Sequence, residues 1–313
     1  MTGLELARGY WETYGIPMIR EGFPEYEGII AAALTGSGSE CYGFDDEVSR
    51  DHDFEPGFCL FIPGEEIVDR RTAFLLERAY AKLPAEYEGF RRQKMNPVGG
   101  QRHGVFRIDE YFTEKLGCPA GEIGMEQWLR LPEYALAEAV NGEVFRDPAG
   151  LLGDCRAILM DMPEDARRKR LAGRLLMMAQ SGQYNYRRCL KHGESGAAQL
   201  AAGEFVRNTV SAVFLLNRTY MPYYKWCFRA LRRLPGGEDL DRSLEWLLTT
   251  DNGEQLADEK AFCMEGIASQ VIDLLQEQGL TEATCGDLEK HAYSVNDGIR
   301  DSEVRNLHIL ACV

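Results

Sequence analysis

The feature that most constrains the fold is a change in hydrophobic pattern about halfway along the chain. In the first half, short apolar runs typical of strands alternate with helical segments, and the clearest strand patterns cover residues 54–62, 105–109 and 142–147. A further apolar run, residues 29–34, could end a helix or form a strand. From Pro163 onward the strand patterns fade and helical periodicity takes over. The change predicts a mixed first part and a helical second part.

The 313 residues are enough for two domains, each with its own core. We predict an α+β domain over residues 1–155, an α/β-type unit with a small mixed sheet, and an all-α helical bundle over residues 156–313. The boundary region, residues 150–163, contains no flexible linker, which favours close packing of the two domains. Helices are expected at residues 1–23, 65–83, 111–117, 165–180, 197–216, 224–234, 240–249, 258–278 and 281–293.

The composition is typical of a globular protein, with 45% hydrophobic and 27% charged residues. A net charge of −15 argues against broad nucleic-acid binding driven by counterion release. The nine cysteines stand singly, without a CxxC pair, which disfavours a zinc knuckle. The sequence shows neither a signal-peptide pattern nor an apolar run of about 20 residues. We therefore expect a cytoplasmic protein with free thiols and no membrane partner.

A glycine–serine pair and two closely spaced aspartates indicate a reaction class. Gly38 and Ser39 precede Asp51 and Asp53, which are separated by one residue and would share one face of a strand. Carboxylate oxygens are ligands that Mg²⁺ prefers, and glycine lets the backbone approach a phosphate without a Cβ clash. The pattern predicts a holder for magnesium and a triphosphate, although such residues also occur in ordinary surface loops. An alternative register takes residues 36–37 as the turn.

This stretch resembles the signature of the DNA polymerase β-type nucleotidyltransferase superfamily, and most of all its aminoglycoside nucleotidyltransferase branch. The matching residues are Gly38, Ser39, Gly43, Ser49, Asp51, Asp53 and Phe54. Over about its full length the chain is similar to a bacterial nucleotidyltransferase-like family of unknown function. That similarity is carried by residues 128–129, 142–145, 183–185 and 215–226. The chain departs from the superfamily signature at His52, which replaces an apolar residue, and at Arg50, which adds one residue before Asp51.

The resemblance implies a magnesium-dependent enzyme that moves a nucleoside monophosphate, expected to be AMP from ATP, to a hydroxyl acceptor and releases pyrophosphate. Two Mg²⁺ ions would be held by Asp51, Asp53 and a third carboxylate, for which Asp109 at the end of the strand 105–109 is the best candidate. Gly38, Ser39 and Ser49 would contact the nucleotide. A small-molecule acceptor is favoured, and a protein or tRNA acceptor stays open.

The second half supplies further candidates for nucleotide binding. Arg187 and Lys225 could neutralise a triphosphate, Tyr223 could stack on a base, and Asn217 could donate hydrogen bonds. Lys225 follows Pro222, which is expected to begin a helix, and a helix N-terminus suits an anion. The opposing interpretation is that these aromatic residues pack in the core or between the domains.

Two interpretations remain open. The basic run at residues 167–170 (Arg-Arg-Lys-Arg) is expected to be a solvated helix face, with a tRNA or acidic-partner contact as the alternative. The protein could also be a non-catalytic nucleotide-binding or protein-interaction module on the same fold. A third carboxylate within reach of Asp51 and Asp53 would favour the enzyme.

Overall fold

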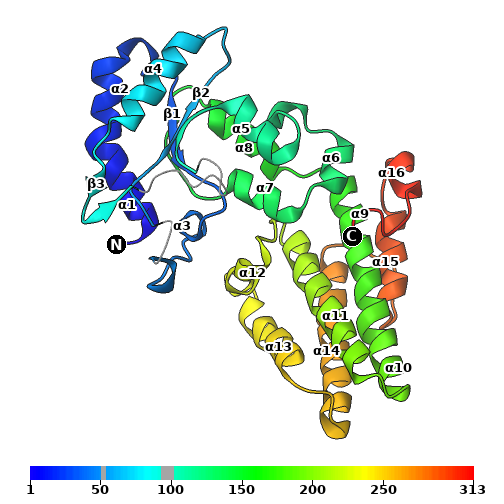
Figure 1. Ribbon diagram of the computed structural model, residues 1–313. Helices are drawn as coiled ribbons and strands as arrows, with labels where there is room; N and C mark the ends of the chain where they lie inside the picture. Colours follow the sequence, from blue (N-terminus) through cyan, green and yellow to red (C-terminus); the bar gives the residue numbers. More distant parts are fainter. Residues whose placement is uncertain (51–53, 93–101) are drawn as a thin grey trace. The chain divides into compact units, whose positions relative to one another are not determined.

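The computed structural model describes residues 1–50, 54–92 and 102–313 (Figure 1). Asp51 and Asp53 lie outside these residues. The chain forms two compact units. The first comprises Met1–Gly124 and Ala135–Asp161, and the second comprises Met125–Tyr134 and Met162–Val313. The chain therefore enters the second unit twice, whereas the sequence analysis predicted a single boundary between residues 155 and 156.

The first unit contains a mixed four-stranded sheet with the strand order β5-β2-β1-β6. Strand β1 (Ala31–Leu34) pairs antiparallel with β2 (Cys59–Ile62) and with β6 (Glu143–Arg146), while β5 (Gly104–Arg107) lies parallel to β2. All residues of β1 and β2 are buried, which explains why both read as continuous apolar runs. The predicted small mixed sheet is present, and the run at residues 29–34 contributes a strand to it.

Helices α1 (Gly3–Tyr10) and α2 (Ile16–Gly22) are joined by a π-helical turn, Trp11–Gly15. A capping box between Thr2 and Glu5 starts α1. The core beside them includes Trp11, Phe58 and Tyr80, whose rings meet edge to face. The other elements of this region are α3 (Ser39–Tyr42), α4 (Arg70–Ala81), β3 (Glu86–Tyr87), β4 (Phe90–Arg91), α5 (Ile108–Leu116), α7 (Glu133–Val140) and α8 (Leu151–Met160).

The described residues of the second unit form helices and loops without a strand. Helix α9 (Glu164–Met178) continues through a π-helical turn, Ala179–Asn185, into α10 (Tyr186–Lys191), and it packs against α11 (Ser195–Leu216) and α15 (Leu288–Asp297). The remaining helices are α6 (Met125–Arg130), α12 (Tyr224–Leu231), α13 (Gly237–Thr249), α14 (Glu254–Glu277) and α16 (Ser302–Asn306). No helix in the described ranges is both long and apolar enough to cross a membrane.

The basic run of α9 is largely buried, so the expectation of a solvated helix face is wrong. Arg167, Lys169 and Arg170 are each at most 3% exposed. The Lys169 ammonium donates to Asn296 Oδ1 (2.8 Å), to the Arg305 carbonyl (3.1 Å) and to the Leu307 carbonyl (2.6 Å). These acceptors come from segments more than a hundred residues away, so local charge pattern could not reveal them. The run holds the second unit together.

Glu133, which is 4% exposed, explains why Met125–Tyr134 belongs to the second unit. Its Oε1 accepts a short hydrogen bond from Ser211 and lies 3.5 Å from an Arg174 terminal nitrogen and 3.9 Å from one of Arg170. Arg170 also donates to the Trp128 carbonyl at 2.7 Å. The segment thus supplies both a counter-charge and a carbonyl acceptor to the buried arginines of α9.

Candidate functional site

The glycine–serine pair lies in the turn that connects β1 to α3. Strand β1 ends at Leu34, and α3 begins at Ser39 with Gly38 as its N-cap in extended conformation. The short helix ends at Gly43, which adopts the left-handed conformation (φ 62°) that glycine tolerates best. The predicted turn is therefore a connection from a buried strand to a helix, and Gly38 and Ser39 stand at its far end.

One side chain, Asn141, holds the start of this turn in place. Its Nδ2 donates to the Gly36 carbonyl at 2.7 Å, and its Oδ1 accepts from the Gly36 N–H at 3.0 Å and from the Thr35 hydroxyl at 3.1 Å. The Thr35 hydroxyl also accepts a 3.5 Å hydrogen bond from Tyr111, a phenol whose pKa is raised by burial. Both backbone polar groups of Gly36 are thus satisfied within the protein, which fixes the path of the chain toward Gly38.

Gly142 is required for Asn141 to reach the turn. Its φ is +71°, and a Cβ on this residue would lie only 1.9 Å from the Leu34 carbonyl oxygen. On the other side, Arg156 donates a short hydrogen bond to the Asn141 carbonyl from a position that is 8% exposed. Sequence reasoning noted Gly142 but missed Asn141, because its partners in the turn lie about a hundred residues earlier in the chain, and it missed Arg156, which acts through Asn141.

A carboxylate–guanidinium pair lies beside Gly38. Glu40 on α3 and Arg102 form an ion pair at 2.5 Å, and their side chains are 12% and 23% exposed. A Cβ on Gly38 would collide with both, at 2.0 Å from Glu40 Oε1 and 2.2 Å from an Arg102 terminal nitrogen. Glycine at this position therefore makes room for the pair. The separation of 62 residues left no sequence signal for it.

The loop after α3 is anchored up to the point where the described residues stop. Asp46 Oδ1 accepts hydrogen bonds from the Ser49 N–H (3.0 Å) and the Ser49 hydroxyl (2.9 Å), and Asp45 accepts from the Gly3 N–H at 2.7 Å. Ser49, predicted to contact the nucleotide, thus forms a local turn with Asp46. The predicted roles of Ser49 and of Asp51 and Asp53, the two aspartates that follow, stay predictions.

The prediction that Asp109 closes a strand is wrong. Strand β5 ends at Arg107, and Asp109 is exposed in the first turn of α5. The reason is the burial of Ile108, Tyr111, Phe112 and Leu116, which repeat at helical spacing. Burial, followed by the nearby Asp109 carboxylate, raises the pKa of Cys155 to about 11. Within the described ranges no three His, Cys, Asp or Glu side chains gather as a metal site.

The four candidates from the second half make separate contacts. Arg187 pairs with Asp258 of α14 at 3.1 Å, and both side chains are exposed. The Asn217 amide donates to the Val213 carbonyl at 2.9 Å at the end of α11. Tyr223, the N-cap of α12, packs its ring against Tyr134 and Tyr224, and the Lys225 ammonium lies 5.0 Å from the Trp226 ring centroid. Within the described part of the chain, no hydrogen bond or ion pair joins any two of these four residues.

Residues 128–227 match the model of a family described as a domain of unknown function, DUF4037. Among solved structures, the chain is similar to that of a nucleotidyltransferase-like protein from Exiguobacterium sibiricum. The two share 12% sequence identity with a TM-score of 0.38, and the match covers 91% of this chain and 80% of the other. No curated protein matches the chain.

Proposed function

We propose that this protein is a magnesium-dependent nucleotidyltransferase that transfers a nucleoside monophosphate, AMP from ATP, to a hydroxyl acceptor and releases pyrophosphate. The observation that carries the proposal is the turn held by Asn141, which leads from β1 to Gly38 and Ser39. The next strand of the same sheet, β2, is preceded in the sequence by Asp51 and Asp53. In-line nucleotidyl transfer needs groups that position the triphosphate and ligands that hold metal ions, and the turn and the Asp-x-Asp pair would supply them.

In this proposal Gly38 and Ser39 contact the phosphates of the nucleotide. Because the protein already satisfies the polar groups of Gly36, the turn needs little ordering when the nucleotide binds. Arg102, held beside Gly38 by Glu40, places a guanidinium near the phosphates and complements their charge. The role of Glu40 is then to orient this guanidinium.

Asp51 and Asp53 would hold the metal, with Asp109 as the candidate third carboxylate. Their oxygen donors suit Mg²⁺, which prefers hard ligands. Bound Mg²⁺ would neutralise the charge that develops on the transferring phosphoryl group. The acceptor hydroxyl would lose its proton to a carboxylate of this set. An acidic protein with a net charge of −15 favours a small, neutral or cationic acceptor over a polyanion.

Equilibrium binding of ATP, measured by calorimetry with magnesium and with a chelator, tests this assignment. We expect wild-type protein to bind ATP more tightly with Mg²⁺, and D51N/D53N to lose this dependence. The matched control is D273N/D297N, which neutralises two exposed aspartates of α14 and α15. Magnesium-dependent binding that persists unchanged in D51N/D53N would show that the metal is held elsewhere.

A further inference from the structure

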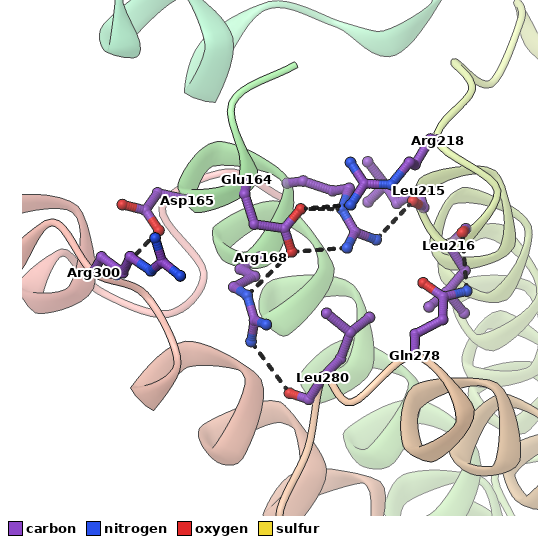
Figure 2. A network of polar contacts seen from close by, with 10 residues as sticks. Glu164, Asp165, Arg168, Leu215, Leu216, Arg218, Gln278, Leu280 and Arg300 are labelled. Atoms are coloured by element: carbon purple, nitrogen blue, oxygen red, sulfur yellow. Dashed lines mark hydrogen bonds and ion pairs between the residues drawn. The ribbon is translucent and has the colours of Figure 1, made fainter. Parts of the chain in front are cut away.

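A second candidate site is a hollow of about 410 Å³ in the helical unit. It lies where α9 begins and α11 ends, next to the segment after α14 (Figure 2). Its volume is within the range of small-molecule sites, roughly 300–1,000 Å³. The lining residues are Glu164, Arg167, Arg168, Leu216, Asn217, Arg218, Gln278 and Leu280.

The charge of this hollow is opposite to that of the protein. Glu164 accepts hydrogen bonds from three arginines: Arg167 (2.8 and 2.9 Å), Arg168 (3.1 Å) and Arg218 (3.0 Å). One carboxylate against three guanidiniums leaves two positive charges uncompensated. Figure 2 shows that the adjacent Asp165 is turned toward Arg300, and its carboxylate accepts a hydrogen bond from the Arg300 backbone N–H at 3.0 Å. Asp165 therefore does not line the hollow.

Arg218 occupies a backbone conformation that favours glycine, so the presence of an arginine there points to a role for its side chain. Arg218 has a φ of +53°, in the left-handed region, where glycine or asparagine is favoured after a helix. The turn is closed by backbone hydrogen bonds from the Arg218 N–H to Leu215 and from the Thr219 N–H to Phe214. Glycine would make these bonds without strain, whereas arginine also places a guanidinium beside Glu164.

Two of the three arginines keep hydrogen-bond donors available. Arg167 uses its remaining terminal nitrogen on the Leu215 carbonyl at 3.2 Å. Arg168 uses Nε on Glu164 and Nη1 on the Leu280 carbonyl, so its Nη2 has no acceptor among the residues that the structure describes. Arg218 uses only Nη2, which donates to Glu164. Its Nε and Nη1 therefore also have no acceptor among the residues that the structure describes. Leu216 and Leu280 add apolar surface to the lining.

We propose that this hollow binds the phosphate group of a small phosphorylated molecule through Arg168 and Arg218. A phosphate monoester carries nearly two negative charges at neutral pH, which matches the local excess, and guanidinium groups donate paired N–H bonds to phosphate oxygens. Glu164 accepts hydrogen bonds from all three arginines and offsets one of their charges, so it competes with a bound phosphate for their donors. The proposal concerns the helical unit and does not depend on the nucleotidyl transfer proposed for the first unit.

Calorimetric titration with inorganic phosphate and with glycerol phosphate, at fixed ionic strength and without magnesium, tests the proposal. We expect both ligands to bind the wild-type protein. R168Q and R218Q should each weaken binding by roughly tenfold or more, because a hydrogen bond between charged groups is lost. The matched control is R207Q. The Arg207 guanidinium pairs with Glu204 on the exposed side of α11, so its removal should leave phosphate binding unchanged.

The variant E164Q separates an anion site from a purely structural cluster. Removing this carboxylate raises the local charge and releases guanidinium donors, so phosphate should bind several-fold tighter even though the fold loses stability. A structural cluster alone would lose stability without any change in phosphate binding. The proposal is overturned if the wild type binds neither ligand at millimolar concentration, if it binds phosphate but not the ester, or if R168Q and R218Q bind like wild type.

Discussion

At the scale of single residues, the turn after β1 depends on a few positions with specific hydrogen bonds or close backbone approaches. Asn141 satisfies the N–H and the carbonyl of Gly36 with one amide group, because an amide carries both an acceptor oxygen and N–H donors. Gly38 leaves room for the Glu40–Arg102 pair, and Gly142 lets the chain pass Leu34. The geometry of the candidate site is therefore set by residues that do no chemistry themselves.

The first prediction concerns Gly142. G142A should lower the free energy of unfolding by about 2–4 kcal/mol, because alanine is strained at positive φ and its Cβ would overlap the Leu34 carbonyl. Urea denaturation followed by circular dichroism measures the change. The control is G28A, where the added Cβ meets no atom within 4 Å, so stability should be nearly unaffected. Equal stability of the two variants would contradict the proposed close approach.

At the scale of elements, α9 is the central helix of the second unit. It packs against α11 and α15, and its basic side chains reach carbonyl groups at the ends of neighbouring segments. Buried cations of this kind are tolerated only when hydrogen bonds replace the lost hydration. The helix thus binds the ends of neighbouring segments through their backbone carbonyl groups.

Lys169 provides a test of this role. K169M should destabilise the protein by about 2–4 kcal/mol, because the Arg305 and Leu307 carbonyls lose their buried donor. Thermal or chemical denaturation gives the magnitude, and limited proteolysis should show earlier cleavage near the C-terminus. K191M, at an exposed lysine of α10, is the matched control and should behave like wild type. A fully stable K169M protein would refute the account.

The contact between α9 and α11 should depend on pH through Glu164. Desolvation raises the pKa of this carboxyl, but the hydrogen bonds and charges of Arg167, Arg218 and Arg168 outweigh it and hold the pKa below its ordinary value of 4.5. A carboxyl with a lowered folded-state pKa contributes stability above its unfolded-state pKa, and this is lost as pH falls through the folded-state value.

We therefore expect wild type to be more stable than E164Q at neutral pH, and the difference to shrink progressively below about pH 4.5. Denaturation curves of both proteins between pH 3 and pH 7 provide the comparison. E126Q, which removes an exposed partner of Arg130, controls for a general change in surface charge. A difference that is constant over this range would mean that the Glu164 charge does not contribute.

At the scale of the whole molecule, sequence patterns predicted the elements better than the contacts between them. Apolar runs indicated the strands because β1 and β2 are buried on both faces, and helical spacing indicated the helices of the second half. The first entry of the chain into the helical unit, through the segment Met125–Tyr134 that contains Glu133, had no local signal. Its cause is a pairing with arginines that lie far along the sequence.

For the candidate site, too, the sequence predicted the local motif but not the residues that support it from distant segments. Gly38 and Ser39 carry a short-range motif, and the structure places them in a strand-to-helix turn. Asn141, Arg102 and Arg156 support that turn from distant segments, so spacing could not identify them. Asp109 was assigned to a strand because the alternation of apolar and polar residues in β5 continues through Ile108 and Asp109. The helical spacing of α5 becomes visible only over the residues that follow.

The central claim is nucleotidyl transfer that depends on Asp51 and Asp53. The most direct measurement is the release of pyrophosphate and the transfer of label from α-labelled ATP, with magnesium and a cell extract as the source of acceptor. We predict magnesium-dependent transfer by wild type and a loss of more than about 100-fold in D51N/D53N, with D273N/D297N unchanged. Equal transfer by wild type and D51N/D53N, or magnesium-dependent ATP binding without any transfer by wild type, would contradict the account.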